Sequence, residues 1–129
     1  MPVSPAELVA VAKATITECS VTEIGECLGQ DTLLIDIREP AEYQRGHIRG
    51  AVLLPRGMLE FEIHKLVDAV RSNPTVGGAE QPIVLYCGTG GRSALAAQCL
   101  ESMGYRNVRS MAGGIVAWIT ARLPVETPV

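Results

Sequence analysis

Cys87 begins the stretch of this sequence whose residue types best suit chemistry. A short apolar run, Ile83-Val84-Leu85-Tyr86, precedes it, and three of the four residues after it are glycine. The apolar run predicts a strand buried on both faces, which places Cys87 at the carboxyl end of that strand. The glycines let the backbone adopt positive φ and turn its N–H groups toward one centre, because no Cβ obstructs the turn. The sequence therefore predicts an anion-binding loop around a sulfur atom.

Arg92 and the segment after it strengthen this prediction. Residues 93–100 are rich in strong helix formers, so the loop leads into the positive end of a helix dipole. Backbone N–H groups, the dipole and the guanidinium each favour the charged form of a nearby thiol and lower its pKa. We therefore expect Cys87 to be a thiolate nucleophile at neutral pH. The alternative is a buried, unreactive cysteine, for which a glycine loop and an arginine have no use.

Length and composition limit the class of protein. The chain has 129 residues, of which 47% are hydrophobic, which is enough for the core of one domain. Its net charge of −3 gives no basic field for nucleic acid, and no run of Lys and Arg or long apolar segment indicates a membrane. The four cysteines lack C-x-x-C spacing, which favours reduced thiols in a cytoplasmic protein. Neither the cysteines nor the two histidines stand at metal-ligand spacing, so we expect no metal.

Strands and helices are predicted to alternate along the chain. Ser4-Pro5-Ala6-Glu7 is a capping box with proline in the first turn, which predicts an N-terminal helix outside the main sheet. Further strands are expected at 15–19, 33–38, 51–54 and 107–111, with helices at 21–28 and 93–103 and helices starting near 39, 57 and 113. This alternation indicates an α/β domain with a mostly parallel sheet covered on both faces. Such sheets bind ligands at the carboxyl ends of their strands, where Cys87 is expected.

Three segments are expected to be irregular. They are a turn at 46–50, a polar loop at 72–81 and a loose tail after Pro124. Met58 and Phe61 are either core residues or part of the wall of a pocket around the sulfur. Cys99 lies about two turns into the helix after Arg92, roughly 10 Å along its axis, so we interpret it as a packing residue and not a second sulfur carrier.

Three blocks of the sequence resemble the signatures of single-domain rhodanese-like sulfurtransferases. These blocks are Asp36-x-Arg38-x-x-x-Glu42-Tyr43-x-x-Gly46-His47-Ile48-x-Gly50-Ala51, the loop Cys87-Gly88-Thr89-Gly90-Gly91-Arg92-Ser93, and Gly113-Gly114-x-x-x-Trp118. They have the order and spacing of that family. The resemblance implies a rhodanese-like domain at 15–124 with a five-stranded, mostly parallel sheet and helices on both faces. An extra N-terminal helix at 1–14 would precede it, and a C-terminal tail at 125–129 would follow.

The resemblance also implies a reaction. Cysteines of this family cycle between thiolate and persulfide, so Cys87 would take a sulfane sulfur from a small anionic donor such as thiosulfate. It would pass that sulfur to a thiophilic acceptor, which is cyanide, a small thiol or the thiol of a protein. The covalent persulfide on Cys87 is the intermediate, and no cofactor is needed. Nothing in the sequence assigns an oligomeric state.

Further residues receive roles from the same resemblance. Main-chain N–H groups of the loop would hold the persulfide, and the Arg92 side chain would meet the anionic donor. A second set would support the site without taking part in the chemistry. The loop set is Gly88, Thr89, Gly90, Gly91 and Arg92, and the supporting set is Asp36, Arg38 and His47.

Two other functions share part of this pattern. Cysteine phosphatases and arsenate reductases also place a cysteine before an anion-binding loop that ends in arginine, but phosphatase loops have five intervening residues and this chain has four. A non-catalytic binding or regulatory module is the second alternative, because a fold alone does not establish an activity. The intact cysteine, glycine loop and arginine favour the enzyme.

Overall fold

The strand that leads into Cys87 lies in the middle of a parallel sheet. The computed structural model describes residues 1–27, 31–70 and 77–128. Every pair of neighbouring strands in the sheet is parallel, which confirms the expected five-stranded α/β architecture. Across the sheet the order is β1 (Thr17–Cys19), β6 (Val108–Met111), β5 (Ile83–Tyr86), β2 (Leu33–Asp36) and β4 (Val52–Leu53). The carboxyl ends of all five strands therefore meet along one edge of the sheet.

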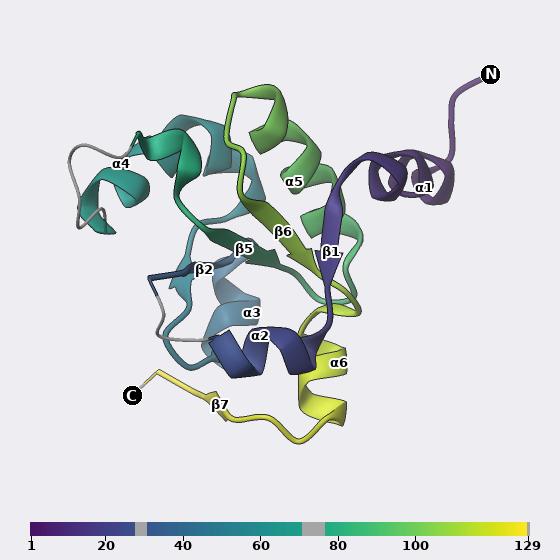
Figure 1. Cartoon of the computed structure of the whole chain (residues 1–129). Coiled ribbons are helices and arrows are strands. Elements are labelled where there is room, and N and C mark those ends of the chain that lie inside the picture. The colour runs from purple at the N-terminus through teal and green to yellow at the C-terminus, as the bar shows by residue number, and fades with distance from the viewer. Residues whose placement is uncertain (28–30, 71–76, 129) are drawn as a thin grey trace.

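Helices cover both faces of the sheet, as Figure 1 shows. The α-helices are α1 (Pro5–Thr15), α2 (Val21–Cys27), α3 (Pro40–Arg45), α4 (Leu59–Val70), α5 (Gly91–Ser102) and α6 (Gly114–Thr120). Short 3-10 helices, η1 (Arg56–Met58) and η2 (Gly78–Glu80), precede α4 and β5. The end of the helix predicted at 21–28 and residues 72–76 of the predicted loop lie outside the described residues, and η2 forms within the rest of that loop.

The alternation of side chains along β5 divides the core into two clusters. Ile83 and Leu85 face one side and pack with α4 and α5, whereas Val84 and Tyr86 face the other side and pack with α2 and α6. Successive side chains of a strand point to opposite faces, so an unbroken apolar run suits a strand that is covered twice. Cys87 continues the first cluster and is itself buried.

Two predictions about irregular segments are wrong. His47–Ile48 forms a short strand, β3, where a turn was expected. It pairs antiparallel with β7 at Val125–Glu126, where a loose tail was expected. Ile48 is fully buried, and the indole of Trp118 donates a hydrogen bond to the carbonyl oxygen of Pro124 over 2.9 Å. The chain is thus held against the core after α6, which brings residues 125–126 beside β3.

Met58 and Phe61 are not core residues. Their exposed fractions are 46% and 71%. Met58 precedes α4, and Phe61 faces away from the buried positions of that helix. The apolar positions that the spacing predicted for α4 are confirmed at Leu59, Ile63 and Val67, which are buried against the sheet.

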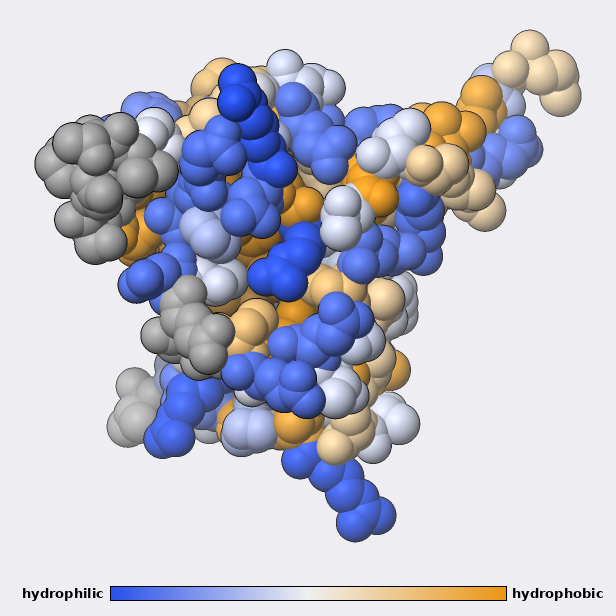
Figure 2. Space-filling model, in the orientation of Figure 1, coloured by the Kyte–Doolittle hydropathy of each residue, from blue (hydrophilic) through white to orange (hydrophobic). Residues whose placement is uncertain are grey.

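Helix α1 forms an arm beside β1, at the upper right of Figure 1. Ser4 caps it as predicted, since its Oγ accepts the N–H of Glu7 over 3.1 Å, and Pro5 occupies the first turn. The helix packs against α5, yet Ala12 is the only residue of α1 that is buried. Leu8 and Val11 are 48% and 61% exposed, and Figure 2 shows hydrophobic residues along this arm. None of the helices in the described ranges is long and apolar enough to cross a bilayer.

Candidate active site

The loop between β5 and α5 wraps around the sulfur atom of Cys87. The backbone N–H groups of Gly90 and Ser93 donate to Sγ over 3.1 and 3.4 Å. Gly90 has φ of 104°, a left-handed conformation, and a Cβ there would lie 3.3 Å from the backbone nitrogen of Gly113. Glycine is required at this position because the turn needs positive φ in a crowded place. The convergent N–H groups predicted from the sequence are therefore present.

The N-terminal turn of α6 holds the outer side of this loop. The N–H of Ile115 donates to the carbonyl oxygen of Cys87 over 2.9 Å, and the N–H of Val116 donates to that of Gly88 over 3.1 Å. Gly114, at φ of 61°, permits this contact, because a Cβ there would collide with both carbonyl groups. The carbonyl oxygens of Cys87 and Gly88 thus bind to α6, while the N–H groups of Gly90 and Ser93 point toward the sulfur. This explains why the Gly113-Gly114 block accompanies the cysteine loop.

The environment of Cys87 favours the thiolate. Burial of the sulfur raises its pKa, since the residue is only 1% exposed. Hydrogen bonds from the hydroxyl and N–H of Ser93, and from the N–H groups of Gly90 and Thr89, act in the opposite direction. Together they outweigh burial, so the pKa of Cys87 lies below that of an ordinary thiol. A thiol with a lowered pKa is suited to nucleophilic attack, because the thiolate is the nucleophile.

A pair of buried hydroxyl groups lies beneath the sulfur. Ser93 Oγ is 3.6 Å from Cys87 Sγ and 2.8 Å from the Oγ of Ser110 in β6. Both serines are fully buried. Ser93 Oγ also donates to the carbonyl oxygen of Gly90 over 3.3 Å, so when Ser110 donates to Ser93, the Ser93 proton is shared between that carbonyl and the sulfur. Sequence reasoning gave neither serine a role: Ser93 appeared only within the loop block, and no local pattern distinguished Ser110.

Arg92 lies over the loop but is held by a partner from another element. Its Nη1 and Nη2 donate to the two carboxylate oxygens of Glu42, in α3, over 2.8 and 3.1 Å. This pair lowers the pKa of Glu42 to about 2 and raises the pKa of Arg92, whose guanidinium also interacts with Cys87. A Cβ at Gly88 would lie 3.2 Å from Nη2, so this glycine leaves room for the guanidinium. Glu42 belongs to the first sequence block, but its contact with the loop was not predicted.

Asp36 and Arg38 form a buried ion pair at the end of β2. Arg38 Nη2 donates to Asp36 Oδ2 over 2.7 Å, and its Nε and backbone N–H bind the same carboxylate. Nη2 also donates to the carbonyl oxygen of Gly46 over 2.7 Å. These hydrogen bonds join β2 to the end of α3, the helix that carries Glu42. The pair therefore lies beside the site and helps to position α3.

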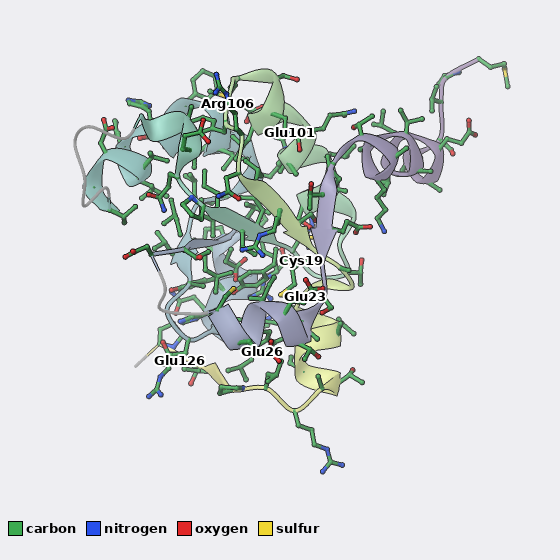
Figure 3. All side chains as sticks on the ribbon, viewed as in Figure 1. Cys19, Glu23, Glu26, Glu101, Arg106 and Glu126 are labelled. Carbon is green, nitrogen blue, oxygen red and sulfur yellow. The ribbon has the colours of Figure 1, made fainter. Side chains whose placement is uncertain are left out.

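His47 is buried in β3 and contacts α3 and β7. Its ring stacks on Tyr43 with centroids 3.7 Å apart, and its Nδ1 lies 3.2 Å from the Tyr43 carbonyl oxygen. On its other side, Nε2 is 3.4 Å from Oε1 of Glu126, which Figure 3 labels near the C-terminus. The structure thus gathers the loop residues around the sulfur, pairs Glu42 with Arg92, and places His47 with Asp36 and Arg38 in the framework beside them.

The other cysteines have different surroundings. Burial raises the pKa of Cys19 to about 11, and this thiol, labelled in Figure 3 beside β1, faces the carbonyl oxygen of Ser110. Cys99 is half-buried on α5 and accepts a hydrogen bond from Arg56 Nη2 over 3.1 Å. All four cysteines are free thiols. Within the described residues, no three His, Cys, Asp or Glu side chains are grouped in a way that could hold a metal ion.

Comparisons with known proteins point to one family. The model of the rhodanese-like domain matches residues 20–121 of this chain. A sulfurtransferase of Allochromatium vinosum is 33% identical over 99 residues, covering 77% of this chain and 82% of that protein. Thiosulfate sulfurtransferase GlpE of Haemophilus influenzae is 32% identical over 111 residues, covering 85% and 94%. A solved structure from Rhodopseudomonas palustris, of unknown function and described as a possible tyrosine phosphatase, matches with a TM-score of 0.80 and 30% identity, covering 98% and 96%.

Proposed function

The chain belongs to the rhodanese-like domain family, and on this basis we propose that it is a sulfurtransferase that carries a sulfane sulfur as a persulfide on Cys87. The observation that supports this most directly is the convergence of the Gly90 and Ser93 N–H groups on Sγ. Fixed N–H dipoles stabilise a sulfur anion without reorganising during the reaction. They serve the thiolate before transfer and the persulfide after it.

The proposed reaction has two displacement steps. The Cys87 thiolate attacks the outer sulfur of a donor such as thiosulfate, the donor's S–S bond breaks, and sulfite leaves with the electron pair. An acceptor, cyanide or a thiolate, then attacks the outer sulfur of the persulfide, and Cys87 leaves as the thiolate. No net oxidation, metal or organic cofactor is required. Reduced thiols of this kind suit a cytoplasmic protein.

The surrounding residues have separate roles in this proposal. N–H groups of the loop from Gly88 to Arg92 hold the sulfur anions, and the Arg92 guanidinium attracts the anionic donor, in competition with Glu42. The Ser93 hydroxyl stabilises the thiolate that forms when the persulfide is spent. Asp36, Arg38 and His47 keep α3 and β3 in place and do not take part in the chemistry.

Intact-mass spectrometry tests the proposal. After incubation with thiosulfate, the protein is expected to gain the mass of one sulfur atom and to lose it when cyanide is added. The Cys87→Ser variant is expected to show neither change, whereas Cys99→Ser behaves like the parent protein. A parent protein that takes no sulfur from thiosulfate, mercaptopyruvate or a glutathione persulfide would contradict the proposal, and would favour a non-catalytic binding module.

A cysteine phosphatase is the second candidate, because a structure with a TM-score of 0.80 is described as a possible tyrosine phosphatase. The loop of this chain argues against it, since only four residues separate Cys87 from Arg92. Hydrolysis of an aryl phosphate that is lost in Cys87→Ser would establish the phosphatase.

A further inference from the structure

A groove lies between the N-terminal helix α1 and the loop that surrounds Cys87. Its volume is about 430 Å³, which falls within the range of small-molecule sites in proteins. One wall is α1 and the other is the outer rim of the loop. The groove is lined mainly by Ala6, Val9, Ala10 and Lys13 from α1, with Thr89 and Gly91 from the loop.

The groove adjoins the reacting sulfur through the loop. Thr89 and Gly91 flank Gly90, whose N–H lies 3.1 Å from Cys87 Sγ. At Gly91, a Cβ would stand 3.6 Å from Cγ2 of Val9, so the helix and the loop are in van der Waals reach. The loop is therefore a wall that the groove shares with the surroundings of the sulfur.

The residues that line the groove indicate which kind of ligand it can bind. Val9 and the alanines of α1 give it an apolar floor, and Lys13 is the charged residue among those that line it. Lys13 Nζ lies 3.9 Å from a carboxylate oxygen of Glu18, and both side chains are partly exposed, so this ion pair is loose. A loosely paired ammonium beside an apolar surface is complementary to an anionic group on an aliphatic chain.

We propose that this groove binds the sulfur acceptor, and that the acceptor is an aliphatic thiol that ends in a carboxylate. The inference depends on the function proposed above and specifies its acceptor class. The thiolate of this molecule attacks the outer sulfur of the Cys87 persulfide and forms a new S–S bond, while Cys87 leaves as the thiolate. The carbon chain lies against Val9, and the carboxylate pairs with Lys13. Helix α1 thus sets acceptor specificity.

The test measures sulfur transfer from the preformed Cys87 persulfide of the full chain to a set of thiols. The probes are mercaptohexanoate with its thiol on the terminal carbon, the matching neutral alcohol mercaptohexanol, and the shorter mercaptopropionate. In the parent protein, mercaptohexanoate is expected to have the lowest KM. Lys13→Gln is expected to raise the KM for mercaptohexanoate by about 1.4- to 5-fold and to leave the KM for mercaptohexanol unchanged.

Matched variants separate binding from general effects. Lys65→Gln removes the same charge from α4, where Lys65 pairs with Glu62, and is expected to change nothing. Glu18→Gln frees Lys13 and is expected to lower the KM for mercaptohexanoate. Val9→Thr keeps the side-chain volume but adds a hydroxyl, and is expected to raise the KM for both of the longer thiols. Val11→Thr makes the same change at a position that is 61% exposed and is expected to have no effect.

Different results would refute this inference and the proposed function. If the parent protein forms a persulfide and transfers it to cyanide, but Lys13→Gln and Val9→Thr leave the KM for every thiol unchanged, the groove does not bind the acceptor. Equal KM values for mercaptohexanoate and mercaptohexanol in the parent protein would overturn it as well. A parent protein that forms no persulfide with any donor would refute the proposed function, and this inference with it.

Discussion

The ion pair between Arg92 and Glu42 gives the sharpest test of how the site meets an anionic donor. Glu42 binds both terminal nitrogens of the guanidinium, so a donor must displace it or share Arg92 with it. We predict that Glu42→Gln strengthens thiosulfate binding, because it removes the competing charge. Gln retains an oxygen that can accept the N–H of Glu39, as Glu42 Oε1 does over 3.0 Å, so the first turn of α3 keeps its cap.

The exposure of the pair sets the magnitude of this effect. The side chains of Arg92 and Glu42 are 42% and 31% exposed, and an ion pair so open to solvent contributes about 0.2–1 kcal/mol. Since about 1.4 kcal/mol is a tenfold change in a dissociation constant, the KM for thiosulfate is expected to fall by about 1.4- to 5-fold. The pKa of Glu42 is about 2, so the carboxylate is charged throughout the neutral range and the effect does not vary between mildly acidic and mildly basic pH.

Initial rates against thiosulfate concentration, with cyanide as acceptor, measure this effect. The gain is expected to shrink as salt is added, because solvent-exposed charges are screened. Glu60→Gln is the matched control, since it breaks an ion pair of the same 2.8 Å length between Glu60 of α4 and Arg56 of η1. An unchanged KM in Glu42→Gln would show that Arg92 does not meet the donor. A higher KM would show that Glu42 orients Arg92 for the donor and does not compete with it.

Three further predictions concern the loop and its framework. Ser93→Ala removes a hydrogen bond that lowers the pKa of Cys87, so the pH midpoint of alkylation by iodoacetamide is expected to move upward. Gly114→Ala collides with the carbonyls of the loop and strains a positive φ, so it is expected to lower the free energy of unfolding by about 1–3 kcal/mol in urea denaturation and to slow persulfide formation. Arg38→Met leaves the Asp36 carboxylate buried without its ion-pair partner. It is expected to lower the free energy of unfolding by about 3–5 kcal/mol in urea denaturation.

Each of these has a control elsewhere in the chain. Ser102→Ala removes an exposed hydroxyl from α5 and should leave the alkylation midpoint in place. Gly104→Ala strains a positive φ of 101° in open space, so it isolates backbone strain from the collision. Arg106→Met breaks an exposed pair with Glu80 and should cost about 1 kcal/mol or less. If a control matches its test variant, the contact invoked for that variant is not responsible.

Local patterns in the sequence predicted the central part of the site. The apolar run of β5, the glycines after Cys87 and the helix formers after Arg92 lie side by side in the chain, so their joint geometry follows from backbone preferences. The Glu42–Arg92 contact joins residues 50 positions apart, and Ser110 of β6 reaches Ser93 of α5. Such contacts depend on strand order, which a single sequence pattern does not specify.

The short strands β3 and β7 escaped prediction for a related reason. Each has two residues, which is too few to show an alternating pattern. They form because Ile48 is buried and because Trp118 holds Pro124. The tertiary packing therefore decides the structure of this segment. The exposure of Phe61 likewise depends on which face of α4 meets the sheet.

The contact between α6 and the loop is completed late in synthesis. The carbonyls of Cys87 and Gly88 are bound by the N–H groups of Ile115 and Val116, nearly thirty positions later in the chain. A ribosome releases the cysteine well before it releases those residues. The two hydrogen bonds that tie the loop to α6 therefore form only after every residue of the loop itself has been synthesised.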